Sequence, residues 1–283
     1  MSAAAPSSAT ASPRAPSSPD TAAPARRERL PTVRTERCTV RDLSPGRRAT
    51  LLATLYPVFA ENLEGFDEET FRDRVLFRAP DARLGLYYAA DGQLVGFSSV
   101  VAVRFRVRGC DHLVLDAGTH IASTHHGGRR SMIFGGTESA RIRLRHPRTP
   151  LWYVPELTNP APYRLLASHA AEFYPSPDRS TPPEVTELLE AVRDARGMTP
   201  VGPPLVARFA NAARGTRAER FRLSPRMAND PLVQHFISLN PGFASGDDLL
   251  FAYPLHTLNL LTTALPVLCA PVRRLFFPPE TTP

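Results

Sequence analysis

The spacing of hydrophobic residues changes twice along the first half of the chain. Apolar residues predict a short strand over Arg37–Leu43 and amphipathic helices over residues 45–59 and 66–77. Arg83–Ala90 and Gln93–Arg108 are rich in β-branched and aromatic residues, and Asp91-Gly92 between them predicts a hairpin. Apolar and polar residues alternate over Val101–Arg108, as in a strand with one face exposed to solvent. The regular structure is therefore expected to begin with a strand, two helices and a hairpin.

A second set of elements follows the hairpin. We expect a third strand over His112–Ser123, a helix over Ser131–Arg145, a short buried strand over Leu151–Val154 and a helix from Asn159 to about Phe173. This order of elements favours an α/β fold with a mixed, mostly antiparallel sheet flanked by helices.

The pattern beyond Pro175 predicts a mainly helical C-terminal extension. Helices are expected over Pro182–Arg196 and Pro231–Ile237. Residues Leu249–Leu268 are the most apolar part of the chain, but prolines interrupt them, and a membrane span needs about 20 mostly apolar residues. A helix packed on the domain is favoured there, and weak membrane contact through residues 249–277 is the alternative.

Three regions are therefore expected: a tail over residues 1–33, a domain over 34–175 and the extension over 176–283. The tail is rich in Ala, Pro and Ser, with almost no large apolar side chains, so it cannot bury enough surface to offset its ordering. We predict that it is disordered. It lacks the apolar core of a secretory signal, and a transit peptide fits its prolines and Asp20 poorly.

Composition excludes several kinds of chemistry. The formal charge is +7, but all 34 basic residues are Arg, scattered among acids, so nucleic-acid binding is not expected. Because Lys is absent, the chain cannot form a Schiff base through Lys or use a P-loop Lys. The three cysteines form no CxxC motif, and the histidines show no zinc spacing, so no metal site is expected and a cytoplasmic location fits.

The turn before the helix at Ser131 has the features of an anion site. A helix N-terminus after a glycine-containing turn presents several backbone N–H groups to a phosphate. Gly127-Gly128 precede this helix, and Arg129 and Arg130 could add charged contacts. An ordinary connection from a strand to a helix is the alternative interpretation.

At this point the chain resembles the GCN5-related N-acetyltransferase (GNAT) superfamily, over roughly Arg37 to Tyr174. That family has the same order of elements, with an Arg or Gln and then a Gly-rich turn at the start of the third helix. Here the turn is His126-Gly127-Gly128-Arg129-Arg130-Ser131, in which the first Gly matches, while His126 and Arg129 stand where the family has other residues.

The resemblance implies a GNAT-like fold, an acyl-CoA co-substrate (acetyl-CoA or longer) and no metal. It implies that residues 126–131 contact the pyrophosphate, and that Ile121 and Ser123 offer backbone groups to the pantetheine arm. It also implies that Asn159 lies near the cofactor and that Tyr163 is a general acid for the departing thiolate.

An acceptor that attacks a thioester must lose a proton, so a base is needed. His120, at the end of the predicted third strand, is the first candidate, with Glu61 and Glu156 as others. Asp247 and Asp248 could face a substrate amine, although such a segment more often forms a turn.

The expected function is acyl transfer from a CoA or carrier thioester to a small-molecule amine or hydroxyl acceptor. The alternatives are a catalytically inactive GNAT-like module that binds a ligand or a protein, and a peripheral membrane protein. The sequence does not indicate an oligomeric state.

Overall fold

The computed structural model describes residues 29–63, 65–209, 223 and 225–262. Its largest sheet has six strands in the order β12-β7-β5-β4-β3-β2. Among them only β5 and β7 pair in parallel, so the predicted mixed, mostly antiparallel sheet flanked by helices is confirmed. The strands are β2 (Arg34–Thr39), β3 (Arg83–Tyr88), β4 (Leu94–Val107), β5 (Cys110–Ile121), β7 (Leu151–Tyr153) and β12 (Tyr253–Pro254).

Side-chain caps begin the first two helices. The Ser44 hydroxyl accepts a hydrogen bond from the Arg47 amide at 3.2 Å and starts α1 (Pro45–Ala60). The Asp67 carboxylate does the same for Thr70 at 2.7 Å and starts α2 (Glu68–Phe71). The predicted second helix continues past α2 as a π-helical turn, so α2 itself is shorter than expected.

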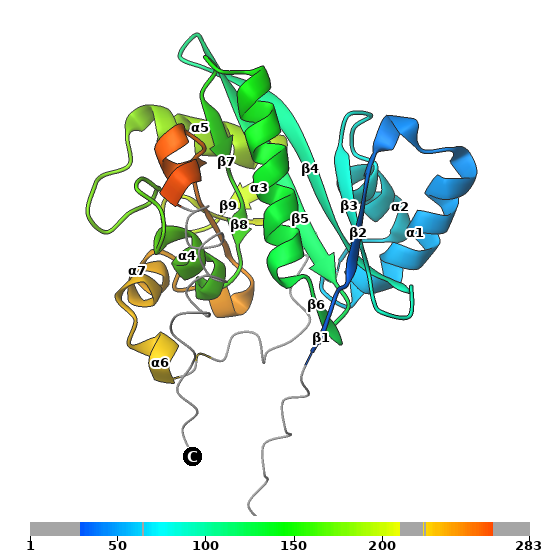
Figure 1. Cartoon of the computed structure of the whole chain (residues 1–283). Coiled ribbons are helices and arrows are strands. Elements are labelled where there is room, and N and C mark those ends of the chain that lie inside the picture. The colour runs from blue at the N-terminus through cyan, green and yellow to red at the C-terminus, as the bar shows by residue number, and fades with distance from the viewer. Residues whose placement is uncertain (1–28, 64, 210–222, 224, 263–283) are drawn as a thin grey trace, which may run out of the picture.

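Helices cover both faces of the large sheet. On one face, seen from the front in Figure 1, α3 (Gly128–Arg145), α4 (Pro160–Ala167) and α7 (Pro231–Leu239) share an apolar cluster with β5 and β7. On the other face, α1 and α2 pack on β3 and β4, and α5 (Pro183–Ala195) packs beside them on β5 and β7. Successive residues of β5 alternate between these faces, as a strand requires.

The extension contributes strands as well as the predicted helices. Helices α5 and α7 lie where they were expected, and α6 (Pro225–Ala228) is a further short helix. A second sheet in the order β8-β11-β10-β9 was not predicted, because its strands are only two to four residues long. They are β8 (Glu156–Leu157), β9 (Met198–Pro200), β10 (Val206–Phe209) and β11 (Asp248–Leu250).

The prediction of one helix over Leu249–Leu268 is wrong for its first part. Leu249 and Leu250 lie in β11, and Tyr253 and Pro254 form β12, all of them buried. Helical backbone begins only at residue 257 and is described to 262, and the remainder of the predicted helix lies outside the described residues. A short apolar run fits a buried strand as well as a helix, and Pro254 separates the two.

The described structure begins inside the predicted tail. Residues 1–28 lie outside the described residues, but Leu30–Pro31 form β1, which pairs in parallel with β6 (His125–His126). The predicted helix from Asn159 to Phe173 is also shorter than expected, because α4 ends at Ala167.

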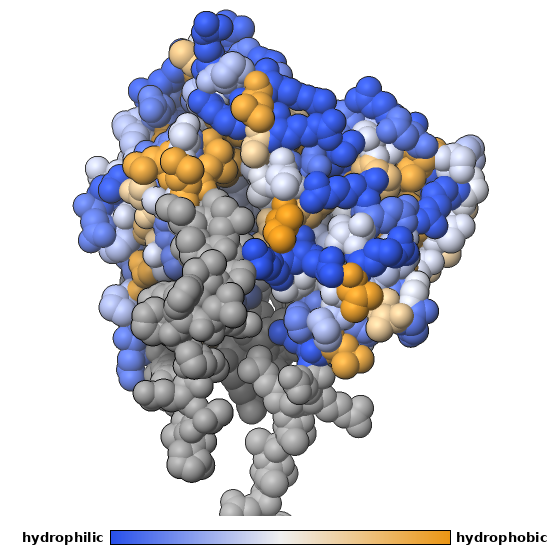
Figure 2. All heavy atoms as spheres, in the orientation of Figure 1, coloured by the Kyte–Doolittle hydropathy of each residue, from blue (hydrophilic) through white to orange (hydrophobic). Residues whose placement is uncertain are grey.

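The surface on the α3 side is largely hydrophilic, with hydrophobic residues in a few small groups (Figure 2). Of the helices that the structure describes, none has the length and apolar character needed to cross a bilayer.

Candidate functional site

The parallel strands β5 and β7 part soon after they meet. Within the described residues they pair at three positions, the last of which joins Leu115 to Tyr153. Strand β5 then continues to Ile121 beside β4, whereas the chain after β7 enters β8 of the second sheet. We call the space between Asp116–Ile121 and Val154–Glu156 the wedge.

Four charged side chains meet at the wedge, and we call Arg78, Asp116, Glu156 and Arg196 the wedge cluster. Arg78 Nη1 lies 2.5 Å from Asp116 Oδ2, and Arg196 Nη2 lies 3.4 Å from Asp116 Oδ1. The other Arg196 nitrogen, Nη1, lies 2.8 Å from Glu156 Oε1 and donates to the Val154 carbonyl, also at 2.8 Å. The Arg196 guanidinium therefore bridges the two sides of the wedge.

The wedge cluster lies between two apolar clusters on one face of the sheet. Asp116 is paired with Val101 of β4, which packs with α1 and α2. Two residues before Asp116 on β5 lies Val114, which packs with α5. Its side chain is 31% exposed and that of Glu156 is 24% exposed. Both carboxylates are therefore partly accessible to a substrate that approaches between these helices.

Burial changes the acidity of the carboxyl groups here. It raises the pKa of Glu156 above its usual value, and the Arg196 charge opposes that effect. Asp248 is 5% exposed, and its Oδ1 has no hydrogen-bond partner among the described residues. Burial, with the nearby charges of Glu156 and Asp247, raises the Asp248 pKa to about 8. Perturbed carboxyls of this kind are typical of groups that hold a proton near neutral pH.

His120 lies on the same face of β5 as Asp116. Its ring packs against Phe59 at 4.8 Å and Phe97 at 5.3 Å between centroids, and the residue is half-buried. Its Nε2 lies 3.2 Å from the place that a Cβ would take at Gly118, the residue between His120 and Asp116 on this face. The ring therefore leans along the strand toward Asp116. Four residues of strand separate the two by about 13 Å, so a substrate or water would have to lie between them.

The end of α1 is fixed to the end of β5. Glu61 accepts a hydrogen bond from the Ser123 amide at 2.9 Å, and the Asn62 side chain donates to the Ile121 carbonyl at 3.1 Å. The groups of Ile121 and Ser123 predicted to meet a pantetheine arm are thus already bonded within the chain. Glu61, predicted as a possible base, here fixes the strand end.

The two glycines before α3 have a packing reason of their own. A Cβ at Gly127 would lie 2.5 Å from Ile121 Cδ1 and 2.9 Å from Ser131 Oγ, so those two side chains would have to move to admit it. Gly128 has a φ of 47°, in the left-handed region that glycine favours. The Ser131 hydroxyl bonds to the Gly128 carbonyl at 3.1 Å and closes the turn.

The strand β1 lies along this turn. His126 pairs with Pro31, and Arg130 Nε donates to the Thr32 carbonyl at 2.9 Å. Arg129 and Arg130 are both exposed, but Arg130 is bonded to Thr32, so of the two predicted phosphate ligands Arg129 is the one without that bond. The first amides of a helix have no acceptor within the helix, although here the Arg130 amide donates to the Gly127 carbonyl at 3.0 Å.

The structure gives Tyr163 and Asn159 structural roles. Asn159 is the N-cap of α4 and accepts from the Ala161 amide at 3.1 Å. Tyr163 is fully buried, and its hydroxyl donates to the Pro175 carbonyl at 2.9 Å. Burial raises its pKa further from neutrality, so we no longer consider it as a proton donor. Its ring lies among those of Phe173, Phe236 and Phe251.

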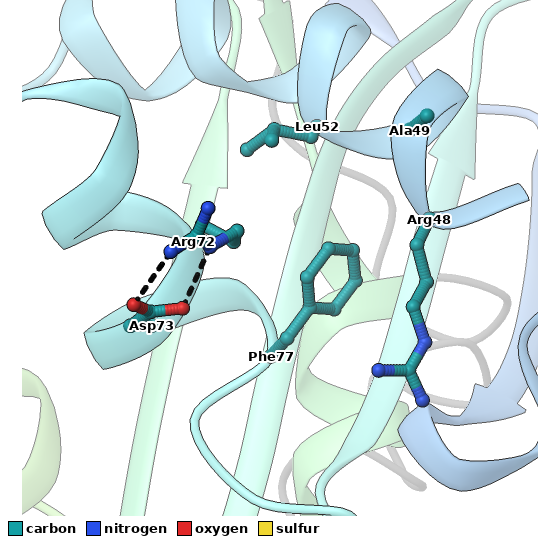
Figure 3. Close-up of a pocket in the computed structure, with 6 residues that line it drawn as sticks. All are labelled: Arg48, Ala49, Leu52, Arg72, Asp73 and Phe77. Atoms are coloured by element: carbon teal, nitrogen blue, oxygen red, sulfur yellow. Dashed lines mark hydrogen bonds and ion pairs between the residues drawn. The ribbon is translucent and has the colours of Figure 1, made fainter. Parts of the chain in front are cut away.

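A surface hollow of about 340 Å³ lies elsewhere, between α1 and the π-helical turn that follows α2 (Figure 3). Arg48 donates to the Val40 carbonyl at 2.8 Å, and Arg72 pairs with Asp73 at 2.7 Å. These side chains are bonded to their own chain, and the hollow contains none of the predicted site residues.

Sequence reasoning found His120, Glu156 and Asp248 but missed Arg78, Asp116 and Arg196. A single acid in the apolar stretch Leu113–Ala117 was the available signal for Asp116. In the part of the chain that the structure describes, no group of three or more His, Cys, Asp or Glu side chains could hold a metal ion.

Comparisons with known proteins add a structural likeness. No family model matches the chain, and a search of curated proteins gives no match. Among solved structures, the crystal structure of Escherichia coli ElaA is similar with a TM-score of 0.32 and 13% identity, over 50% of this chain and 92% of that one. The fold described above rests on the strand order and register of the chain itself.

Proposed function

We propose that this chain is an acyl-CoA-dependent acyltransferase that works in the wedge. The observation that supports it best is the parting of β5 from β7, with an acidic side chain on each side and a half-buried histidine on the same face. A thioester between the strands would meet an acceptor arriving between α1 and α5.

The wedge supplies candidates for the base that the reaction needs. The acceptor amine or hydroxyl attacks the thioester carbonyl, the carbon–sulfur bond breaks, and the acyl group passes to the acceptor. The proton lost by the acceptor goes to a base, for which His120 is the first candidate and Glu156 the second. The thiolate leaves and takes a proton from solvent or from a protonated carboxyl such as Asp248.

The cofactor would be held at the start of α3. The amides there and the exposed Arg129 are suited to a pyrophosphate. The turn needs no phosphate to explain its glycines, so binding must be measured directly.

Thermal shift with acetyl-CoA and longer acyl-CoAs tests this proposal. A ligand at a hundred times its Kd should stabilise the chain by about 2.7 kcal/mol. Arg129→Ala should reduce the shift, whereas Arg106→Ala, an exposed arginine on β4, should not. The absence of a shift with every acyl-CoA would overturn the proposal.

Replacement of His120 tests the assigned base. Removal of a general base typically lowers turnover by about a hundredfold or more. We expect His120→Gln to show that loss with little change in acyl-CoA affinity. The control is His169→Gln, at an exposed histidine. Equal turnover in both variants would remove His120 from the mechanism.

One observation favours a second candidate, a GNAT-like module that binds a ligand without catalysis. Arg196 occupies the wedge, with bonds to both carboxylates and to the Val154 carbonyl. Under this alternative, acyl-CoA or another ligand shifts the melting temperature, but a panel of amines and alcohols gives no CoA release.

The proposed partner is a small-molecule acceptor, and a cytoplasmic location stays a prediction. Of the residues 249–277 considered for membrane contact, residues 249–255 offer no apolar side chains to a membrane, because the side chains from Leu249 to Leu255 are buried. The rest of that stretch beyond residue 262 lies outside the described residues. Liposome flotation of the full chain tests it.

A further inference from the structure

We propose that a second site, on the opposite face of the sheet from the wedge, binds the phosphate group of a small phosphate ester. It is a pocket of about 190 Å³ that we call the arginine pocket. Its lining comprises Thr39, Arg41, Arg83, Arg141 and Arg145.

Four elements bring these residues together. Thr39 ends the edge strand β2, and Arg83 begins β3 directly opposite it. Arg41 follows β2 in a short helical turn. Arg141 and Arg145 lie one turn apart on α3, so they project from the same side of that helix. The pocket is therefore formed by rigid elements rather than by a loop.

The positive charge of the arginine pocket is not balanced by the chain. Within the described residues, the acid paired with its arginines is Glu138, whose Oε2 lies 3.4 Å from Arg83 Nε and 3.8 Å from Arg141 Nη1. Four guanidinium groups against one carboxylate leave a formal charge of about +3. Like charges held together at this density are costly unless an anion joins them.

Arg83, in the lining of the pocket, and its neighbour Glu138 are also incompletely bonded. The Glu138 side chain is 3% exposed, and its Oε2 and the Arg83 Nε have no hydrogen-bond partner among the described residues. Arg83 Nη1 donates to the Thr39 hydroxyl at 2.6 Å, which orients the guanidinium. The fixed arginine, with Arg41 and the two α3 arginines around it, presents planar donor pairs, the geometry that suits a phosphate.

Size favours a small ligand. A volume of about 190 Å³ has room for a phosphate group and for the first atoms of the ester bound to it. The body of the ester would extend into solvent past the exposed Arg41, Arg141 and Arg145. The pocket shares no residue with the wedge, so this proposal is independent of acyl transfer.

Isothermal titration of the full chain tests the proposal with two probes, inorganic phosphate and glucose 6-phosphate, in chloride buffer of matched ionic strength. Glucose is the uncharged comparator. Tighter binding of the ester than of phosphate indicates an ester ligand, and equal binding indicates that phosphate alone is recognised. We expect saturable 1:1 binding of at least one probe and none of glucose.

Two double variants that lose the same charge distinguish specific phosphate binding in the arginine pocket from non-specific attraction of anions to a basic protein. Arg141→Gln/Arg145→Gln should weaken phosphate binding by about tenfold or more, because each charged contact is strong. Arg104→Gln/Arg106→Gln, on the exposed part of β4, should leave it unchanged. Arg41→Gln, from a different element, should weaken it too. Absence of saturable binding, or equal weakening in the β4 control, overturns the proposal.

Discussion

The wedge cluster and the arginine pocket lie on opposite faces of the same sheet. Both consist of charged side chains, but they differ in how far these charges are balanced. In the wedge cluster, two arginines meet two carboxylates, and the guanidinium of Arg196 satisfies both sides. In the arginine pocket, four arginines meet one carboxylate. A balanced cluster is stable without a ligand and must be opened for a substrate, whereas an unbalanced one is completed by a ligand.

Removal of Arg196 should cause the largest loss of stability. In Arg196→Ala, Asp116 would keep its ion pair with Arg78, but Glu156 would lose the arginine with which it pairs. Breaking a buried pair on one side typically costs about 3 to 5 kcal/mol, and partial exposure places our expectation near 3 kcal/mol. Urea unfolding followed by fluorescence of Trp152, the one tryptophan of the chain, measures this loss.

Arg193→Ala is the control for that variant. Arg193 lies on α5 and pairs with the largely exposed Asp194, and such a pair contributes less than about 1 kcal/mol. Adding Glu156→Gln to Arg196→Ala should recover part of the stability, because it removes one uncompensated charge. Similar losses for Arg196→Ala and Arg193→Ala would show that the wedge cluster is not a balanced unit.

Removal of Glu138 is the corresponding change in the arginine pocket. We expect Glu138→Gln to lower the free energy of unfolding by about 1 to 2 kcal/mol, because Arg83 and Arg141 lose their shared counter-ion. Unlike the loss in the wedge, this one should be recovered by added phosphate, which would bind the variant more tightly than the parent. Melting temperatures of the parent chain and of Glu138→Gln, measured at increasing phosphate concentrations, give both the loss of stability and its recovery.

Glu190→Gln, at an exposed position on α5, should show neither the loss nor the recovery. If phosphate stabilises Glu138→Gln no more than it stabilises the parent chain, the contrast between the two clusters fails.

The main sheet could be predicted because its signals are local. Alternation along β4 and the Asp91-Gly92 turn define the hairpin without any tertiary information. The stretch from Leu249 was predicted wrongly, because an apolar run of that length is compatible with either a strand or a helix. Only pairing with Glu156–Leu157 and Tyr153 decides in favour of strands.

The candidate site likewise has one part with a local sequence signal and another without one. The turn at Gly127 was found because a helix start has a local signature. The wedge cluster was not, because Arg78, Asp116 and Arg196 come from three distant segments, and no spacing rule joins them. The residues of the arginine pocket are also far apart in the sequence, as Arg41, Arg83 and Arg145 show. In a chain with 34 arginines, only the fold distinguishes these few from the rest.

Asp248 on β11 differs from the wedge cluster in its ionisation, because its carboxyl is buried and burial outweighs the opposing charge of Arg208. The Asp248 pKa is raised from 3.8 to about 8, so the folded chain holds this proton more tightly than the unfolded chain does. Stability from this group is therefore complete below about pH 4 and is lost as the pH rises toward 8. Asp248→Asn should remove the loss, so its gain over the parent chain should be close to zero at pH 4 and grow to several kcal/mol by pH 8. Urea unfolding at several pH values measures the difference, and Asp247→Asn, which breaks a bond to Arg208, should destabilise instead. A gain that does not grow with pH would show that Asp248 is already ionised in the folded chain.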